Sequence, residues 1–254
     1  MTRLTLGSLV RSALATYRED FWRIAGLAVI VFVPLSLVQT FVEWAADAYE
    51  EIAGGSVRIA VLAIAFAGTS AAIFGLTFFA GALDRMVGAR RFGHEDVPLR
   101  QVVRTLPYGR LVTANVVVVL VVEVGFLLLV VPGAVALTLL AIVGPLVNIE
   151  GHTVREALRH SVRLIRPRFW LAFFGVTVPV MLEEGFAHSI TIAVWDESFV
   201  QGFLVNVAFA LVVGATIGLL EVTLAHALIA GDRLEREPEL TPARAGGLPR
   251  NSSA

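Results

Sequence analysis

The stretches YREDFW (17–22) and IRPRFW (165–170) are two versions of one phrase, and each stands just before a long apolar run. The likeness extends backwards, because LVRSALATYREDFW (9–22) aligns without a gap with ALRHSVRLIRPRFW (157–170). The identical pairs are Arg11 and Arg159, Arg18 and Arg166, Phe21 and Phe169, and Trp22 and Trp170. We interpret the pair as an internal duplication. The alternative is that any surface segment before a membrane span has this composition.

The composition is that of a membrane protein. Hydrophobic residues make up 57% of the 254 residues and charged residues 16%, whereas a soluble domain has about half apolar and a quarter charged residues. The chain contains no Cys, which excludes a disulfide framework and a thiolate metal site.

Six stretches approach the roughly 20 apolar residues that a spanning helix needs. They are 24–42, 57–83, 111–131, 134–149, 169–195 and 198–230. The fourth is short and follows the break at Pro132-Gly133, and the fifth carries Glu183-Glu184, so that 185–195 either spans or lies along the outer surface. We therefore predict an all-α integral membrane protein with one transmembrane domain over 1–231.

The arginines predict the orientation. All basic residues are Arg, and nineteen of the twenty precede span one, follow span six or lie between spans two and three or four and five. Arg58 is the exception. Because Arg is retained in cytoplasmic loops, we expect both termini on the cytoplasmic side of the cell membrane. We also expect a disordered cytoplasmic tail over 232–254. The first apolar run is longer than the roughly 7–15 residues of a signal peptide, so we expect it to span rather than to be cleaved.

The repeated phrases predict surface helices that turn into spans. Apolar residues recur at helical spacing in 6–21 and 154–165, with the arginines on other faces, and Thr153 with Glu156 forms a capping box. Such a helix lies in the membrane interface, and Phe-Trp marks the entry into the bilayer. A weaker third candidate is 98–110, with Tyr108 in the aromatic place. The expected contacts to lipid headgroups are Arg11, Arg18, Trp22, Arg159, Arg166 and Trp170.

VVPGAVALTLLAIVGPLVNIEGHTVREALRHSVRLIRPRFW (130–170) resembles the signature stretch of the glycerophosphoryl diester phosphodiesterase membrane-domain family, a group of bacterial and archaeal multi-span proteins. The opening LTLGSLVRSALATYREDFW (4–22) is similar to the start of that family. Val162 stands where the family often has Trp, and Pro167 where it often has Gly. The resemblance implies no phosphodiesterase activity, because the family's hydrolase is a separate soluble barrel. The matching pieces are Pro132-Gly133, Glu150-Gly151, Ala157-Leu158-Arg159, Ser161, Leu164, Arg166 and Phe169-Trp170.

Two carboxyls are predicted near the middle of the membrane. Glu123 follows Arg110 by about 19 Å of helix and Glu221 precedes Arg233 by about 18 Å. Polar groups inside spans are usually functional or paired. We expect the two to meet as a proton or cation site, with one or both protonated because burial and a like charge disfavour ionisation. The alternative is a neutral carboxyl bonded to Asn115, Asn206 or a backbone carbonyl. Ala210, Gly214 and Gly218 form a small-residue seam that allows another helix to pack closely. Glu221 follows Gly218 by three residues and so lies on roughly the same helix face, which is expected to face the bundle.

The enzyme interpretations are weak. Glu183-Glu184-x-x-x-His188 approaches an intramembrane-protease motif but has His in place of Arg, and no phosphate loop or nucleophile elbow is present. We therefore predict no catalytic residue, cofactor or metal. The expected function is a lipid-interacting or scaffolding membrane module. The alternative is a transporter or channel for a lipid or small solute that uses the buried carboxylates. The expected partners are anionic lipids rather than nucleic acid, and a homo-oligomer or a second membrane protein stays open.

Overall fold

The structure is built from helices throughout the part of the chain that it describes. The computed structural model describes residues 4–53, 58–91, 99–149, 153–183, 185–186 and 198–240. The helices are α1 (Leu6–Glu19), α2 (Phe21–Ala53), α3 (Arg58–Arg91), α4 (Leu99–Thr105), α5 (Tyr108–Leu128), α6 (Val130–Leu140), α7 (Val143–Ile149), α8 (Val154–Ile165), η1 (Arg166–Arg168), α9 (Phe169–Ala172), η2 (Phe173–Thr177), α11 (Phe199–Phe209), η3 (Ala210–Gly214) and α12 (Ala215–Leu240). The turn η1 is a 3-10 helix, whereas η2 and η3 are wider π-helical turns within the fifth and sixth helical stretches.

Six helical stretches among the described residues are long and apolar enough to cross a membrane. Each overlaps one predicted span, so the chain is a multi-pass, all-α membrane protein. Residues 187–197, which decide whether the end of the predicted fifth span crosses or lies on the surface, fall outside the described residues. The six stretches are Phe21–Val42, Ser70–Val87, Tyr108–Leu128, Val130–Asn148, Val154–Glu183 and Phe199–Asp232.

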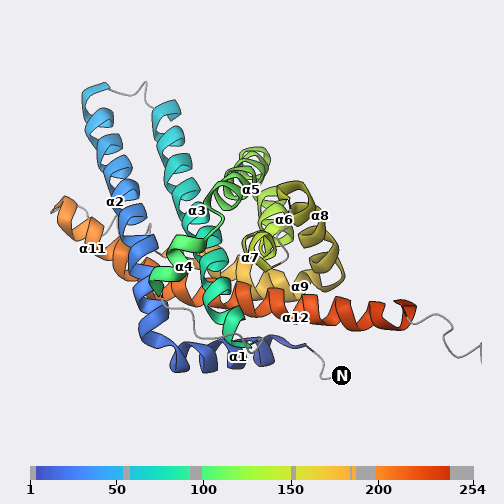
Figure 1. Ribbon diagram of the computed structural model, residues 1–254. Helices are drawn as coiled ribbons and strands as arrows, with labels where there is room; N and C mark the ends of the chain where they lie inside the picture. The colour runs from blue at the N-terminus through green and yellow to red at the C-terminus, as the bar shows by residue number, and fades with distance from the viewer. Residues whose placement is uncertain are drawn as a thin grey trace, which may run out of the picture.

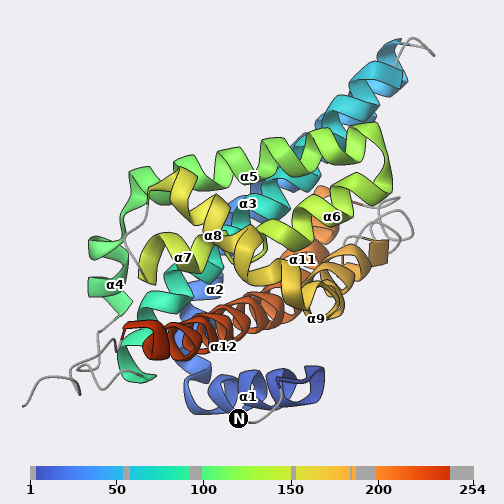
Figure 2. The ribbon, with the colours of Figure 1, turned by 90° about the vertical axis from the view of Figure 1, so that its right-hand side faces the viewer.

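Helix α3 is the centre of the bundle. It packs against α2, α5, α7 and α12, and α2 and α3 form a long hairpin that α12 crosses at a steep angle (Figure 1). Helices α5, α6 and α8 lie on the side of α3 away from α1, and α1 lies below α12 (Figure 2). The core therefore joins the beginning, middle and end of the chain around one helix. Its largest fully buried side chains include Phe79, Leu83, Leu111, Ile142 and Leu224.

The two copies of the repeated phrase fold alike. Helices α1 and α8 each begin with a capping box, Thr5 with Ser8 and Thr153 with Glu156, and these positions correspond in the ungapped alignment. In each copy the next helix begins at the Phe of Phe-Trp, after Asp20 in the first copy and after η1 in the second. Figure 1 shows α2 rising from the end of α1, and Figure 2 shows α8 bending into α9.

Most positions that are buried in one copy are also buried in the other, which supports a duplication, although Thr177 is buried where Val29 is 47% exposed. In α1 and α8 the buried pairs are Leu9 and Ala157, Ala13 and Ser161, and Thr16 and Leu164. In the spans that follow they are Ile24 and Ala172, Ala28 and Val176, and Phe32 and Val180.

The weaker third candidate has a similar outline. Helix α4 is short, a break follows at Leu106 and Pro107, and α5 begins at Tyr108. The Tyr108 hydroxyl joins the two helices by donating a hydrogen bond to the backbone carbonyl of Val103 in α4. The middle of the chain thus also consists of a short helix followed by a helical hairpin, α5 and α6.

One predicted boundary is wrong, and one helix continues past another. The break after the third span falls at Leu129, whose backbone is extended (φ −166°, ψ 154°), and not at Pro132-Gly133. Pro132 instead lies in the first turn of α6, where the N–H that proline lacks has no intrahelical acceptor. The tail predicted to be disordered from 232 continues α12 as far as Leu240. Its Leu, Glu and Arg residues favour helix, and extending an existing helix needs no new nucleus. Residues 241–254 lie outside the described residues.

Candidate functional site

Glu123 is buried in α5 and has a hydrogen-bond partner that the sequence did not reveal. The Ser70 hydroxyl on α3 donates a hydrogen bond to Glu123 Oε1 at 3.0 Å, and 2% of Glu123 is exposed. The two predicted amide partners bond elsewhere. Asn115 donates to the backbone carbonyl of Phe74 at 3.3 Å, and Asn206 donates to the Thr40 hydroxyl at 3.0 Å.

Glu221 is buried in α12, and its Oε2 atom has no hydrogen-bond partner among the described residues. It lies between two contacts of α12 with α3, Gly218 against Phe79 and His226 against Asp84. On α3, Phe79 is about 13 Å further along the axis than Ser70, the partner of Glu123. The structure shows no hydrogen bond between Glu123 and Glu221, and the paired-carboxylate site stays a prediction.

The predicted small-residue seam on span six is a place of close helix contact. A Cβ atom on Gly218 would lie 2.5 Å from the ring of Phe79, and one on Gly214 would lie 3.1 Å from the ring of Phe32. Ala210 lies one helical turn before Gly214 and lines the pocket described below. The three small residues therefore let α2 and α3 approach the sixth span closely.

A buried polar network, which the sequence did not reveal, joins α3, α7 and α12. The Nε2 atom of His226 lies 2.9 Å from Asp84 Oδ1. The Asn148 amide donates to Asp84 Oδ2 at 2.9 Å, and Arg85 donates to Asn148 Oδ1 at 3.3 Å. Asp84 and His226 are 2% and 8% exposed. The network fastens the second, fourth and sixth spans to each other near one end of the bundle.

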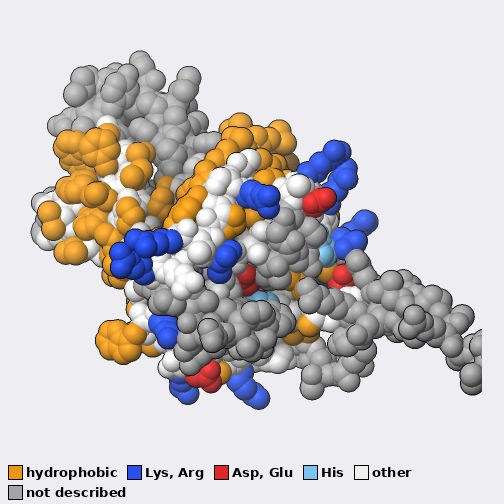
Figure 3. Space-filling model, viewed as in Figure 1, with side chains coloured by type: hydrophobic (Ala, Val, Ile, Leu, Met, Phe, Trp, Pro, Cys, Tyr) orange, Lys and Arg blue, Asp and Glu red, His pale blue; other side chains and the backbone are white. Residues whose placement is uncertain are grey.

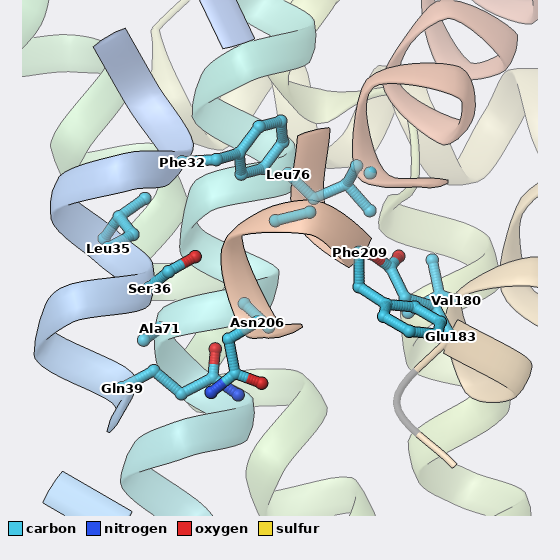
Figure 4. A pocket seen from close by; sticks show the side chains of 13 residues that line it. Phe32, Leu35, Ser36, Gln39, Ala71, Leu76, Val180, Glu183, Asn206 and Phe209 are labelled. Atoms are coloured by element: carbon cyan, nitrogen blue, oxygen red, sulfur yellow. The ribbon is translucent and has the colours of Figure 1, made fainter. Parts of the chain in front are cut away.

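A pocket lies between α2, α3, the helical residues 178–183 and the stretch from α11 to η3 (Figure 4). Its polar side chains are Ser36, Gln39, Glu183 and Asn206, and in Figure 4 the amide groups of Gln39 and Asn206 lie next to each other. One carboxylate and no basic residue stand among these lining side chains. The apolar lining consists of Phe32, Leu35, Ala71, Ala72, Leu76, Val180, Phe209, Ala210 and Gly214.

The pocket lies where the two copies of the repeat meet. Phe32 and Leu35 lie 10 and 13 residues after Trp22, Val180 and Glu183 lie 10 and 13 residues after Trp170, and all four line the pocket. A glycine of the following helix approaches each copy. A Cβ on Gly75 would lie 2.7 Å from Leu35 Cδ1, and one on Gly214 would lie 3.4 Å from Glu183 Oε1. The second copy thus places a carboxylate where the first has a leucine.

The predicted headgroup contacts are on the surface. Trp22 is 84% and Trp170 67% exposed, and the four arginines of the set, Arg11, Arg18, Arg159 and Arg166, are all exposed. On the face shown in Figure 3, basic side chains gather over α1, α4 and α8, and hydrophobic side chains cover the side of α2 and α5. The charged and the apolar surfaces are therefore separated on this face.

Among the described residues, no three His, Asp or Glu side chains come together as a metal site. The motif that begins at Glu183-Glu184 runs into residues outside the described part, including His188. No family model, no curated protein and no solved structure matches the chain. The resemblance to the phosphodiesterase membrane-domain family therefore rests on the residues quoted for it above.

Proposed function

We propose that the protein is a non-enzymatic, lipid-interacting membrane module of the cytoplasmic membrane that holds anionic headgroups against α1 and α8. The observation that carries the proposal is the pair of exposed tryptophans, Trp22 and Trp170, each at the junction of an arginine-bearing helix and a span. Tryptophan favours the headgroup level of a bilayer. A fold that leaves both indole rings uncovered needs something amphipathic to cover them, and lipid at the interface meets that need.

The arginines beside the tryptophans supply the charge. In α1 the buried Leu9, Ala13 and Thr16 face the bundle, while Arg11 and Arg18 are exposed. Arginine binds phosphate through paired N–H groups, and each basic residue close to an anionic surface contributes about 1 kcal/mol of attraction. Helix α8 repeats the arrangement with Arg159, and Arg166 follows in η1. Both helices therefore present a packed face to the bundle and guanidinium groups to their surroundings.

The experiment is native mass spectrometry of the purified full chain after exchange into mixed micelles of phosphatidylglycerol and phosphatidylcholine. We expect phosphatidylglycerol to be retained preferentially. The fourfold variant Arg11→Gln, Arg18→Gln, Arg159→Gln and Arg166→Gln should lose most of that preference. The matched fourfold Arg→Lys variant should keep part of it, because lysine keeps the positive charge but lacks the paired N–H groups of the guanidinium. A wild-type chain without preference for the anionic lipid, or a glutamine variant that keeps it, contradicts the proposal.

A second candidate function is transport of a small solute or lipid. The observation that favours it is the position of the pocket between two copies of the repeat, since internal repeats commonly flank the substrate site of transporters. The buried Glu221, with an unbonded Oε2 atom, is the group best placed to carry a proton. Proton-coupled flux into liposomes is the test. Glu221→Gln should abolish it, and flux that is unchanged in both Glu221→Gln and Glu123→Gln excludes this use of the carboxyls.

A further inference from the structure

We propose that Asp232 of α12 competes with anionic headgroups for the arginines of α8 and η1, so that an acidic group of the protein itself regulates lipid binding by the second copy of the repeat. The inference rests on the headgroup function proposed above and adds a device that controls it. Three observations carry it: the position of Arg163, the contacts of Asp232, and a difference between the two copies.

Arg163 lies in the middle of the surface expected to hold headgroups. It follows Arg159 by four residues and precedes Arg166 by three, and residues at these spacings are neighbours on one side of a helix. All three arginines are exposed, and the Arg163 side chain is 57% exposed. A phosphate held by Arg159 or Arg166 therefore lies beside the Arg163 guanidinium.

Asp232 contacts this surface from α12. Its Oδ2 atom lies 3.9 Å from Arg163 Nη2 and 3.9 Å from His160 Nε2. Arg168 approaches the preceding residue, since a Cβ atom on Gly231 would lie 3.5 Å from Arg168 Nη1. Two guanidinium groups and one imidazole therefore lie against residues 231 and 232 of α12. Because a carboxylate and a headgroup phosphate carry the same sign of charge, they compete for these groups.

The contact is weak enough to be exchanged for a lipid. The Asp232 side chain is 25% exposed, and ion pairs that water reaches contribute little to stability. An anionic membrane surface attracts a nearby arginine by a comparable amount. Because the two alternatives are close in free energy, the headgroup can take the place of the carboxylate. By linkage, a headgroup on Arg163 weakens the hold of α8 on Asp232 by the factor by which Asp232 weakens the headgroup.

The first copy of the repeat differs at the positions that make these contacts. In the alignment of 9–22 with 157–170, Ala15 stands in place of Arg163 and Asp20 in place of Arg168. Asp20 is 9% exposed and lies 3.9 Å from Arg23 of its own copy. We therefore expect the regulation to be confined to the second copy, while the arginines of α1 bind headgroups independently of Asp232.

The experiment uses the full chain in the same mixed micelles of phosphatidylglycerol and phosphatidylcholine, with native mass spectrometry as the readout. Asp232→Asn should raise the preference for phosphatidylglycerol by about two- to fourfold, the range expected for release of a partly exposed ion pair. Glu19→Gln is the matched control, because it removes the same charge from an exposed position of α1, and its effect should be smaller. Thermal unfolding in detergent checks that each variant is folded.

A double-mutant cycle shows whether Asp232 acts through Arg163. In an Arg163→Gln background, Asp232→Asn should lose most of its effect on lipid preference. No rise in Asp232→Asn, an equal rise in Glu19→Gln, or the same rise with and without Arg163 would overturn the inference. A wild-type chain without preference for phosphatidylglycerol sinks the headgroup function as well, whereas a wild-type preference that Asp232→Asn leaves unchanged sinks this inference alone.

Discussion

The Nε2 atom of His226 in α12 lies 2.9 Å from the Oδ1 atom of Asp84 in α3, and both side chains are buried. Asn148 of α7 donates to the other Asp84 oxygen. One carboxylate thus holds three helices that are far apart in the sequence.

Removal of this carboxylate should be among the most damaging single changes. We expect Asp84→Ala to lower the free energy of unfolding by about 1–3 kcal/mol, since it removes the acceptor of the Asn148 amide and the carboxylate beside the buried His226. Reversible unfolding in mixed detergent micelles measures it. Asp232→Ala is the matched control, because Asp232 is partly exposed and lies 3.9 Å from Arg163, and it should cost less than about 1 kcal/mol. Equal losses in the two variants would count against the network.

Removal of the Glu221 carboxyl should raise the stability of the protein, whereas removal of the Asp84 carboxylate lowers it. Its buried Oε2 atom has no hydrogen-bond partner among the described residues, so replacement by an apolar residue of similar size removes an uncompensated polar group. We expect Glu221→Met to raise the free energy of unfolding by about 1–3 kcal/mol. Glu123→Met should give no such gain, because it breaks the bond from Ser70. Thermal unfolding in detergent compares the two, and a lower melting temperature for Glu221→Met would refute this account.

The contact between Gly218 and Phe79 leaves no room for a methyl group. With a Cβ only 2.5 Å from the ring, Gly218→Ala should cost about 1–3 kcal/mol of stability through overpacking. Gly109→Ala is the control, because no heavy atom lies within 4 Å of its added Cβ. Alanine should stabilise the helix there by about 0.5–1 kcal/mol. Opposite shifts of the two melting temperatures are the expected result, and a shared direction would contradict the contact.

The predicted orientation can be tested by thiol labelling, because the chain has no cysteine of its own. Single cysteines at Ala15, Thr105, Arg155 and Ser198 all fall at exposed positions. A membrane-impermeant maleimide should label the first three from the cytoplasmic side, in inside-out vesicles, and Ser198→Cys from the opposite side, in intact cells. Labelling of Thr105→Cys and Arg155→Cys from opposite sides would disprove the six-span arrangement.

The sequence predicts the helices well, because they follow from local patterns. Six apolar runs of sufficient length can form little but helices in a membrane, and the gapless match of 9–22 with 157–170 carries over to equal burial at Leu9 and Ala157. The error at Pro132-Gly133 has a local cause too. A proline ends a helix only where its missing N–H would be needed, and in the first turn of α6 it is not.

The side-chain partners could not be predicted, because they depend on which helix faces which. Glu123 and Glu221 are both buried, but their positions along the spans do not tell which helices meet. Glu123 faces Ser70 of α3, and Asp84, just past the end of the predicted second span, gave no signal of its own. Its partners lie in α7 and α12, and a single sequence holds no information on pairings at that distance.

The wide turns η2 and η3 make the fifth and sixth helical stretches intolerant of a change in length. Loss of one residue from either turn would restore an ordinary α-helix and rotate everything after it by about 100°. In the sixth stretch that rotation would carry Gly218 away from Phe79 and His226 away from Asp84 in a single step. In the fifth it would turn Glu183 out of the pocket. Single-residue deletions that a surface loop would absorb are therefore disruptive at these two places.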